Sequence, residues 1–242
     1  NIIDKYLSMR PRKYLFACFV DFKAAFDSIW RKALIYKLAQ AGIGGQFLQL
    51  ISDMYREVHY CLKLDGGMTE YFESQKGVKQ GCVLSPMLFN TFIRDLPAEF
   101  DNTCDPVNLW DTNINSLLYA DDLVILSESA HGLQNCLDKL EAYCLRWNLT
   151  VNLQKTKIII FNKGGHIIKR FSFTFGSNQI ETTQEYCYLG IIFTASGSLT
   201  KAVQNLVEWA QKAYFKLRQF NIRDHVLVGL KLFEALVMPL LR

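Results

Sequence analysis

The chain has 242 residues, of which 50% are hydrophobic and 13% aromatic, and its formal net charge is +4. This composition suffices for one sizeable core with an appended subdomain, and it excludes disorder over most of the length. The nearly balanced charge neither requires nor excludes a nucleic-acid partner, because acidic surface elsewhere can offset a basic groove.

The cysteines and the hydropathy pattern bear on the cellular compartment in which the protein resides. The seven cysteines are scattered and include no Cys-x-x-Cys pair, which disfavours a disulfide framework and a zinc site and favours reducing conditions. The first ten residues lack the apolar core of a signal peptide, and no uncharged apolar run reaches ~18 residues. We therefore expect an intracellular protein, nuclear or cytoplasmic, that is neither secreted nor membrane-bound.

The first half of the chain predicts alternating strands and helices. An apolar run at residues 14–20 predicts a buried strand that ends at Asp21. Asp27 is placed to cap a helix over residues 28–41, which Gly42 would end. The elements predicted next are a helix over 47–56, a hairpin whose strands at 58–64 and 70–74 flank Asp65-Gly66, and a helix that opens at Ser85-Pro86 and runs to Asp95.

The middle of the chain predicts a loop, a tight hairpin and a long helix. Residues 101–115 are polar and irregular, which predicts a loop. Apolar runs at 117–119 and 123–126 lie on either side of Ala120, Asp121 and Asp122, which predicts strand, turn and strand. The clearest helical period follows, with apolar residues at Leu133, Leu137, Leu140, Cys144 and Trp147.

The last third changes from strands to helices near residues 195–197. Strands are predicted at 157–161, at 171–175 and, interrupted by Gly190, at 186–193. Beyond Gly197 the pattern is helical, and a second helix is predicted over 226–238. One face of the first helix gathers Leu199, Val203, Leu206, Ala210, Ala213, Leu217 and Phe220.

Three aspartates stand where apolar strands end. Asp21 follows residues 16–20, and Asp121 and Asp122 are adjacent between two apolar runs. A carboxylate beside a buried strand loses solvation, and neighbouring like charges repel. Ordinary strand-end and turn positions account for each feature taken singly, since aspartate is common in turns. Brought together on one sheet, the same carboxylates would form an oxygen-rich Mg²⁺ pocket, and two ions roughly 3.5–4 Å apart support phosphoryl transfer.

Five segments, in order and at family-like spacing, resemble the motifs of reverse transcriptases from retrotransposons that lack long terminal repeats. They are residues 19–27 (Phe-Val-Asp-Phe-Lys-Ala-Ala-Phe-Asp), 77–86 (Gly-Val-Lys-Gln-Gly-Cys-Val-Leu-Ser-Pro), 119–122 (Tyr-Ala-Asp-Asp), 147–157 with Asn152 and its following lysines, and 188–190 (Tyr-Leu-Gly). The resemblance implies an RNA-directed DNA polymerase that uses two Mg²⁺ ions, or Mn²⁺, an RNA template, a DNA primer and deoxynucleoside triphosphates.

The resemblance also implies the metal ligands and the sugar gate. Asp21, Asp121 and Asp122 would bind the two ions, with Asp121 the more critical of the adjacent pair, and the backbone carbonyl of Phe22 would assist. Phe26 would lie beneath the sugar and exclude a ribose 2′-hydroxyl. An aromatic ring at that position is also an ordinary core residue.

Further roles follow for nucleotide and primer contacts. Gln80 and Gly81 would line the incoming nucleotide, although Gly81 also suits a plain turn. Lys155 or Lys157 would neutralise or protonate the leaving pyrophosphate, and the sequence does not choose between them. A primer grip would comprise Tyr188, Leu189 and Gly190, which also fit a strand with a glycine bulge. Phosphate contacts on the terminal helices, or else an ordinary solvated helix face, would involve Lys201, Lys212, Lys216, Arg218 and Arg223.

The chain departs from the family pattern at a few positions. Ala24 stands where relatives often carry a basic residue, and Val83 stands where many have proline. The segment before Asp21 does not resemble the family's fingers motifs, and the chain ends within the region that resembles the thumb. We therefore expect a piece of a longer polymerase.

Together these patterns predict an α+β fold. Residues 1–195 would form a polymerase palm, an antiparallel sheet backed by helices, and residues 196–242 a truncated helical thumb. The predicted function is RNA-directed DNA polymerase. One alternative is a catalytically incompetent relic that only binds nucleic acid. The other is an RNA-templated RNA polymerase, which a ring as large as that of Phe26 disfavours.

Overall fold

A six-stranded sheet organises the computed structural model, which describes residues 2–8, 13–101, 104–219 and 226–240. In spatial order the strands are β11 (Phe173–Phe175), β12 (Asn178–Thr183), β10 (Lys157–Phe161), β1 (Leu15–Val20), β9 (Asp122–Ser127) and β8 (Ser116–Tyr119). All neighbours pair antiparallel except β10 and β12, which are parallel. The predicted antiparallel sheet is therefore confirmed, with one parallel pair added.

The central strand β1 is buried on both faces, which explains its unbroken apolar sequence. Successive side chains of a strand point to opposite faces. Phe16, Cys18 and Val20 accordingly enter the larger core, and Ala17 and Phe19 enter a second, smaller one.

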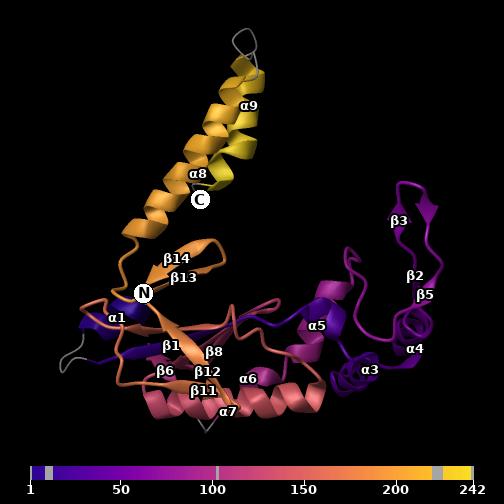
Figure 1. Ribbon diagram of the computed structural model, residues 1–242, viewed down its shortest axis with the longest axis horizontal. Helices are drawn as coiled ribbons and strands as arrows, with labels where there is room; N and C mark the ends of the chain where they lie inside the picture. Colours follow the sequence, from indigo (N-terminus) through magenta and orange to yellow (C-terminus); the bar gives the residue numbers. More distant parts are fainter. Residues whose placement is uncertain (1, 9–12, 102–103, 220–225, 241–242) are drawn as a thin grey trace.

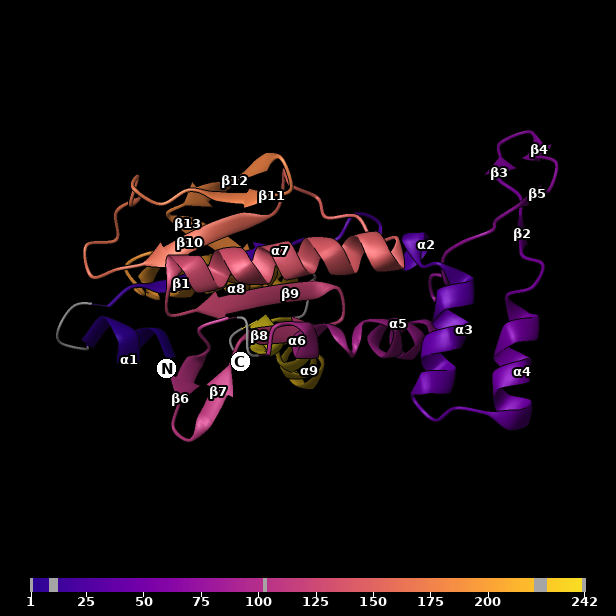
Figure 2. The ribbon, with the colours of Figure 1, turned by 90° about the horizontal axis from the view of Figure 1, so that it is seen from below.

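Helices cover the face of the sheet that holds the larger core (Figures 1 and 2). The longest of them there is α7 (Ala130–Trp147), which begins where the Ser129 hydroxyl accepts a hydrogen bond from the Gly132 N–H at 2.9 Å. It ends at Asn148, whose φ of 57° closes the helix in the left-handed region. The predicted apolar stripe is confirmed, because its leucines and Cys144 are all buried.

Towards the end of the molecule that carries a long, narrow hairpin lie α2 (Ala25–Ser28), α3 (Arg31–Gln40), α4 (Gly45–Met54) and α5 (Ser85–Ile93) (Figure 2). The short α6 (Leu96–Glu99) lies nearer the middle, where it contacts α7. The hairpin comprises β2 (His59–Tyr60), β3 (Lys63–Leu64), β4 (Gly67–Met68) and β5 (Phe72–Glu73). It turns at Asp65-Gly66, as predicted.

The opposite face of the sheet is covered by α1 (Ile2–Ser8) and by a hairpin of β13 (Glu185–Tyr188) and β14 (Ile191–Thr194) (Figure 1). The Phe19 ring joins sheet and hairpin, since it stacks on Tyr186 with 4.7 Å between ring centroids. The smaller core therefore holds this hairpin against β1, the strand that Asp21 follows.

The chain ends in two helices, α8 (Thr200–Gln219) and α9 (Val226–Leu236), with a 3-10 turn at Met238–Leu240 (Figure 1). They project away from the sheet and share a small core of Ala210, Leu217 and Val237. The predicted apolar face of α8 is only partly buried, since Val203 is 56% exposed. Phe220 lies outside the described residues.

Three local predictions were wrong. Asp27 caps no helix: it lies inside α2, and an extended break at Ile29 and Trp30 separates α2 from α3. The predicted loop at 101–115 contains a hairpin, β6 (Val107–Leu109) and β7 (Thr112–Ile114), which turns without glycine. The single strand predicted at 186–193 is instead the hairpin β13–β14, because the chain reverses at Leu189-Gly190.

The cysteine prediction also needs correction. Cys104 and Cys136, which are 32 positions apart in sequence, form a disulfide with their Cα atoms 5.8 Å apart. Spacing alone could not reveal this pair, because residue 104 meets α7 only in the folded chain. No helix within the described ranges is long and apolar enough to span a membrane.

Candidate active site

Two strand ends bring the predicted carboxylates to one edge of the sheet. Val20 pairs with Leu123 across β1 and β9, so Asp21 and Asp122 occupy the next positions at the same edge. Tyr119 pairs with Asp122 across β8 and β9, which leaves a two-residue turn containing Asp121. Residues a hundred positions apart in sequence are therefore neighbours.

The electrostatics of Asp122 reflect this clustering. Partial burial raises the pKa of its carboxyl above the ordinary value, and the negative charges of Asp121 and then Asp21 raise it further. The pKa of the Tyr186 hydroxyl is also raised, first by burial and then by Asp21 and Asp122. A compact negative potential therefore exists at this edge, and a bound cation would relieve it.

A cavity of about 420 Å³ opens beside these carboxylates. Six of the predicted site residues line it: Asp21, Phe22, Phe26, Gln80, Asp121 and Lys155. Asp122, Gly81, Lys157 and residues 188–190 do not. The first palm motif, the second motif, the turn of β8–β9 and the lysine-bearing loop thus meet around one space.

The loop that follows α7 fixes the strand end that carries Asp21. The carbonyl oxygen of Asp21 accepts a hydrogen bond from the Asn152 N–H at 2.7 Å, and its own N–H donates to the Thr156 hydroxyl at 3.1 Å. The Lys23 N–H donates to the Thr150 carbonyl at 2.7 Å. These bonds hold the backbone around Asp21 in place and bring Lys155 to the cavity.

The two candidate lysines differ in their partners. Lys157 lies within β10, and its ammonium group pairs with the carboxylate of Glu181 at 2.7 Å. Lys155 lines the cavity, and no ion pair of its side chain occurs among the described residues. The geometry therefore favours Lys155, a choice that the sequence left open.

Phe22 and Phe26 both line the cavity, but they present different groups to a ligand. The Phe22 side chain is buried in the larger core, so only its backbone is available to a ligand. The Phe26 ring is half-buried and stacks on Phe89 with 4.9 Å between centroids. It is thus both a packing residue and a wall of the cavity.

The second motif is attached to the first by hydrogen bonds. The Val78 N–H donates to the Phe26 carbonyl at 2.9 Å. The side-chain amide of Gln80 donates to both carboxylate oxygens of Asp27, at 3.0 and 2.9 Å. Gly81 follows with a φ of 79° and open space around it, which suits the turn into α5.

Three non-glycine residues beside the site adopt left-handed backbone conformations. They are Ala24 with φ 48°, Ala120 with φ 52° and Leu189 with φ 49°. Such a conformation costs about 1–2 kcal/mol for a residue with a side chain. Strained backbone conformations occur preferentially at functional sites. These three residues therefore support the hypothesis that their turns take part in function.

The predicted primer-grip residues lie next to the carboxylates, outside the cavity. The Tyr188 hydroxyl donates to the carbonyl oxygen of Asp122 at 3.5 Å, and burial followed by the charge of Asp122 raises the Tyr188 pKa. Leu189 is 50% exposed at the tip of the hairpin, with Gly190 beside it at φ 80°. The hairpin thus presents an apolar tip beside the acidic edge.

The donor set fits a hard cation, although the side chains do not yet enclose one. Carboxylate and carbonyl oxygens are the ligands that Mg²⁺ prefers. Throughout the described ranges, however, no three His, Cys, Asp or Glu side chains converge closely enough to hold a metal ion. Binding of one ion by all three would therefore require the carboxylates of Asp21, Asp121 and Asp122 to turn towards a common point.

The basic residues predicted to meet a product duplex lie on α8, with one exception. Lys212, Lys216 and Arg218 are exposed, whereas Lys201 forms an ion pair with Glu185 of β13. Arg223 lies outside the described residues. Of the five predicted basic residues, Lys212, Lys216 and Arg218 are therefore the ones in the described ranges whose side chains are free to contact phosphate.

Five residues that line the cavity were not among the predicted site residues: Lys23, Ala24, Ala25, Asp27 and Asn152. Asp27 was interpreted as a helix cap, and Asn152 was quoted only as part of a motif; both line the cavity. Asp27 and Asn152 both lie within the segments that resemble the family motifs, and this was the sequence signal by which they could have been found.

Comparison with known proteins decides the family. Residues 2–193 match the family described as "Reverse transcriptase (RNA-dependent DNA polymerase)". The chain belongs to this reverse transcriptase family. The resemblance inferred from its five motifs is thereby confirmed.

Curated relatives of this reverse transcriptase domain come from mobile elements. It is 28% identical, over 96% of its length, to the "RNA-directed DNA polymerase from mobile element jockey" of Drosophila funebris. It is 32% identical, over 81% of its length, to the "Retrovirus-related Pol polyprotein from type-2 retrotransposable element R2DM" of Drosophila melanogaster. The domain spans only 26% and 19% of those two proteins, respectively.

Solved structures show the same fold. Apo telomerase from Candida tropicalis matches 85% of this chain and 35% of the telomerase chain, with a TM-score of 0.58 and 13% identity. A version truncated from its C-terminal domain matches 81% of this chain and 37% of that chain, with a TM-score of 0.55 and 16% identity. At these identities the likeness concerns the fold alone.

Proposed function

We propose that this domain catalyses RNA-directed DNA synthesis, adding deoxynucleoside triphosphates to the 3′-hydroxyl of a DNA primer on an RNA template. The observation that carries the proposal is the shared cavity of Asp21 and Asp121, beside an Asp122 whose pKa both neighbouring charges raise. The family and the polymerase relatives support the same reaction.

The carboxylates would act by holding metal. Two divalent ions bound by Asp21, Asp121 and Asp122, with the Phe22 carbonyl, would activate the primer hydroxyl and stabilise the leaving oxygen. Until ions bind, the three carboxylates repel one another, and this repulsion favours cation uptake.

The other residues of the cavity would position the substrate. Lys155 supplies a cation beside the carboxylates, where it would neutralise or protonate the leaving pyrophosphate. Phe26, held by its stack on Phe89, would occupy the space that a ribose 2′-hydroxyl needs. Gln80, tied to Asp27, would line the nucleotide base, and Gly81 lets the backbone turn there.

The hairpin β13–β14 would hold the primer. Leu189 and Gly190 form its tip beside the acidic edge, and Tyr188 anchors it to the Asp122 backbone. The exposed Lys212, Lys216 and Arg218 of α8 would contact phosphates of the product duplex, in a salt-sensitive mode without sequence preference.

Primer extension tests the proposal. The chain is given an RNA template annealed to a DNA primer, deoxynucleotides and Mg²⁺ or Mn²⁺. Asp121→Asn should lower incorporation by about 100-fold or more, because metal stabilisation is worth several kcal/mol. The control Asp111→Asn changes an exposed aspartate in the β6–β7 turn and should leave incorporation unchanged.

Two results would overturn the proposal. Incorporation that Asp121→Asn leaves intact would place the chemistry elsewhere. Tight binding of the template–primer with no incorporation by the unaltered chain would instead support a non-catalytic binding domain.

A further inference from the structure

A second cavity, of about 520 Å³, lies where the end of α7 meets α3 and the end of α5 (Figure 2). We call it the α7 pocket. None of the residues proposed to act in DNA synthesis lines it, so its chemistry needs a separate explanation. The lining residues that matter for that chemistry are Tyr36 and Lys37 of α3, Arg94 and Asp95 after α5, and Arg146 and Trp147 of α7.

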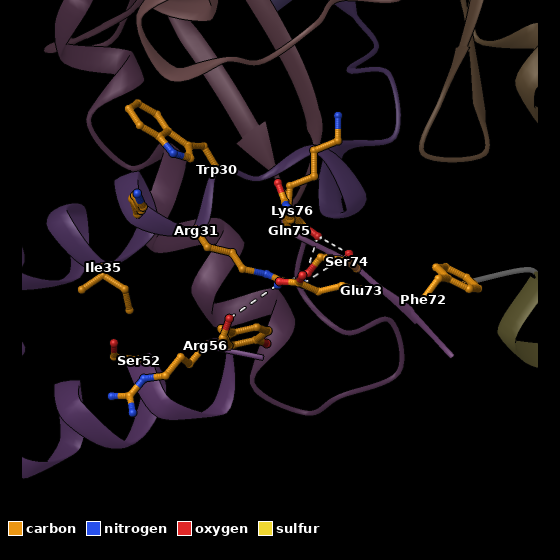
Figure 3. Close-up of a pocket in the computed structure, with 12 residues that line it drawn as sticks. Trp30, Arg31, Ile35, Ser52, Arg56, Phe72, Glu73, Ser74, Gln75 and Lys76 are labelled. Atoms are coloured by element: carbon orange, nitrogen blue, oxygen red, sulfur yellow. Dashed lines mark hydrogen bonds between the residues drawn. The ribbon is translucent and has the colours of Figure 1, made fainter. Parts of the chain in front are cut away.

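The pocket wall contains one of two buried cations of α3. Near the start of the helix, Arg31 donates to carbonyl oxygens of the segment that follows β5 (Figure 3). Near its end lies the buried Lys37. The ammonium group there donates to the Phe92 carbonyl at 2.6 Å, the Tyr143 hydroxyl at 2.5 Å and the Asp95 carboxylate at 2.7 Å. Because these bonds use all three of its hydrogens, Lys37 gives the pocket positive charge but no free donor.

Two guanidinium groups on the same wall have donors to spare. Arg94 is exposed, and no ion pair of its side chain occurs among the described residues. The side chain of Arg146 is 54% exposed and pairs with Glu99 through one of its nitrogens, at 2.6 Å. A guanidinium carries five N–H donors and no acceptor. The wall therefore suits a ligand group with several acceptor oxygens.

The charges of the pocket favour an anion. Lys37, Arg94 and Arg146 line it, and within the described chain Asp95 is the one carboxylate that does so. Even when Glu99 is counted, because of its pair with Arg146, three cations face two carboxylates. An anionic ligand would therefore complete the charge balance of this pocket.

Trp147 adds a donor and an aromatic surface. Its buried indole N–H lacks a hydrogen-bond partner within the described residues. Buried polar groups are normally paired, so an acceptor atom of a ligand or of water is expected there. The Trp147 ring stacks on the ring of Tyr36, with 6.2 Å between their centroids, and Tyr36 is 55% exposed. The pocket thus joins free donors to an exposed ring.

We propose that the α7 pocket binds a phosphate group between the guanidinium groups of Arg94 and Arg146. A phosphate offers at least three acceptor oxygens, whereas a carboxylate offers two, and the wall supplies donors from two separate segments and from Trp147. The volume lies in the range of small-molecule sites. Free phosphate and the phosphate of a nucleotide share this chemistry, and in a nucleotide the base would stack on Tyr36.

The position of the pocket gives a bound phosphate a structural consequence. Asn148 follows Trp147 and ends α7, and four residues later the Asn152 N–H holds the Asp21 carbonyl at 2.7 Å. A phosphate that joins Arg146 to the end of α5 would fix the end of α7, and with it the loop that holds Asp21. Binding itself does not depend on the proposed polymerase activity.

The first test measures binding of inorganic phosphate to the full chain by isothermal titration calorimetry, with EDTA present to remove divalent ions. Arg94→Gln and Arg146→Gln should each weaken binding by about 10-fold or more, through lost hydrogen bonds to a charged group. Arg170→Gln changes an exposed arginine outside the pocket and should leave the affinity unchanged. Lys155→Gln removes the cation of the carboxylate cavity and should also leave it unchanged.

The second test identifies the source of the phosphate. Adenosine monophosphate and adenosine are titrated in the same way. Tighter binding of the monophosphate than of inorganic phosphate, by about 5-fold or more and lost in Tyr36→Ala, would assign a nucleotide. Equal affinities would assign free phosphate. Adenosine that binds as tightly as its monophosphate would overturn the proposal.

The third test follows the indole N–H of Trp147 by nuclear magnetic resonance. Its signal, assigned by its loss in Trp147→Phe, should shift when phosphate is added, whereas the signals of Trp30, Trp110 and Trp209 should not. An unshifted Trp147 signal at saturating phosphate would contradict the proposed position of the ligand.

The outcomes separate this inference from the proposed function. Phosphate affinity that Lys155→Gln removes and Arg94→Gln leaves intact would place the phosphate in the carboxylate cavity, which overturns the α7 pocket and leaves the polymerase proposal standing. The absence of binding at millimolar phosphate would overturn it as well. Phosphate binding that depends on Arg94 in a chain without incorporation would support the pocket and count against the polymerase.

Discussion

The side-chain amide of Gln80 donates to both carboxylate oxygens of Asp27, so one pair of side chains joins the first and second motifs at the mouth of the carboxylate cavity. Asp27→Ala should remove this restraint on Gln80. Because a hydrogen bond to a charged group is worth about 1.5 kcal/mol or more, we expect the nucleotide KM to rise by about 10-fold in primer extension.

The matched control is Gln49→Ala. Gln49 makes the same kind of bond to Asp53, at 3.1 Å on the exposed surface of α4. This variant should leave the nucleotide KM unchanged. An unchanged KM in Asp27→Ala as well would show that Gln80 needs no such support.

Lys155 and Lys157 provide a second test of the site. Lys155→Ala should lower kcat by about 100-fold, as expected for the loss of a group that assists pyrophosphate departure. Lys157→Ala removes only the ion pair with Glu181, so kcat should stay within a few-fold. Single-turnover incorporation measures both, and a larger loss for Lys157→Ala would reverse the assignment.

Gly77 and Gly81 share a left-handed backbone but differ in their surroundings. A Cβ on Gly77 would lie 2.7 Å from the Asp27 carbonyl oxygen, whereas nothing lies within 4 Å of a Cβ on Gly81. Gly77→Ala should therefore lower the free energy of unfolding by about 2–5 kcal/mol, through strain plus overpacking. Gly81→Ala should cost only about 1–2 kcal/mol. Urea unfolding followed by circular dichroism compares them, and equal losses would contradict the predicted clash.

Lys37 is buried in an aromatic enclosure at the end of α7. Its ammonium group pairs with Asp95 at 2.7 Å, donates to the Tyr143 hydroxyl at 2.5 Å and lies 4.0 Å from the Trp147 ring. Burial lowers the Lys37 pKa, and the bond to Asp95 opposes this shift. Asp95→Ala would leave the buried cation without its carboxylate.

We expect Asp95→Ala to lower the free energy of unfolding by about 1.5–3 kcal/mol, the range for a hydrogen bond to a charged group, since the half-exposed carboxylate is partly screened by solvent. Lys37→Met in the Asp95→Ala background should recover part of this loss, because it removes the buried, unpaired positive charge while keeping a side chain of similar volume. Thermal unfolding measures both. If Lys37→Met worsens the loss, the cation does not depend on Asp95.

The Tyr6 hydroxyl gives the stability of α1 a pH dependence. Burial, followed by its hydrogen bond to Glu128, raises the pKa of Tyr6 to about 12 from an ordinary value of 10.0. A raised pKa contributes stability that is complete below pH 10 and is lost as the pH rises through 12. Over that window the loss should amount to about 2–3 kcal/mol. Urea unfolding at pH 9 to 12 should show a steeper decline for the unaltered chain than for Tyr6→Phe, and parallel declines would contradict the raised pKa.

The sequence by itself determined the family and the main strands and helices, and it drew attention to three aspartates at strand ends. An unbroken apolar run sufficed for β1, because that strand is buried on both faces, and helical periodicity sufficed for α7, because only one of its faces packs on the sheet. The motifs also singled out Asp21, Asp121 and Asp122, which the fold brings to one edge of the sheet. Their role as metal ligands stays a prediction.

Only the tertiary structure decided what depends on contacts between distant segments. It showed that Lys157 pairs with Glu181 of β12, whereas Lys155 lines the cavity. It turned Asp27 from a helix cap into the partner of Gln80, and it joined Cys104 to Cys136. The physical reason is common to these cases: a side chain's charge and hydrogen-bonding capacity are local properties, whereas the partner that satisfies them is fixed by how strands and helices pack.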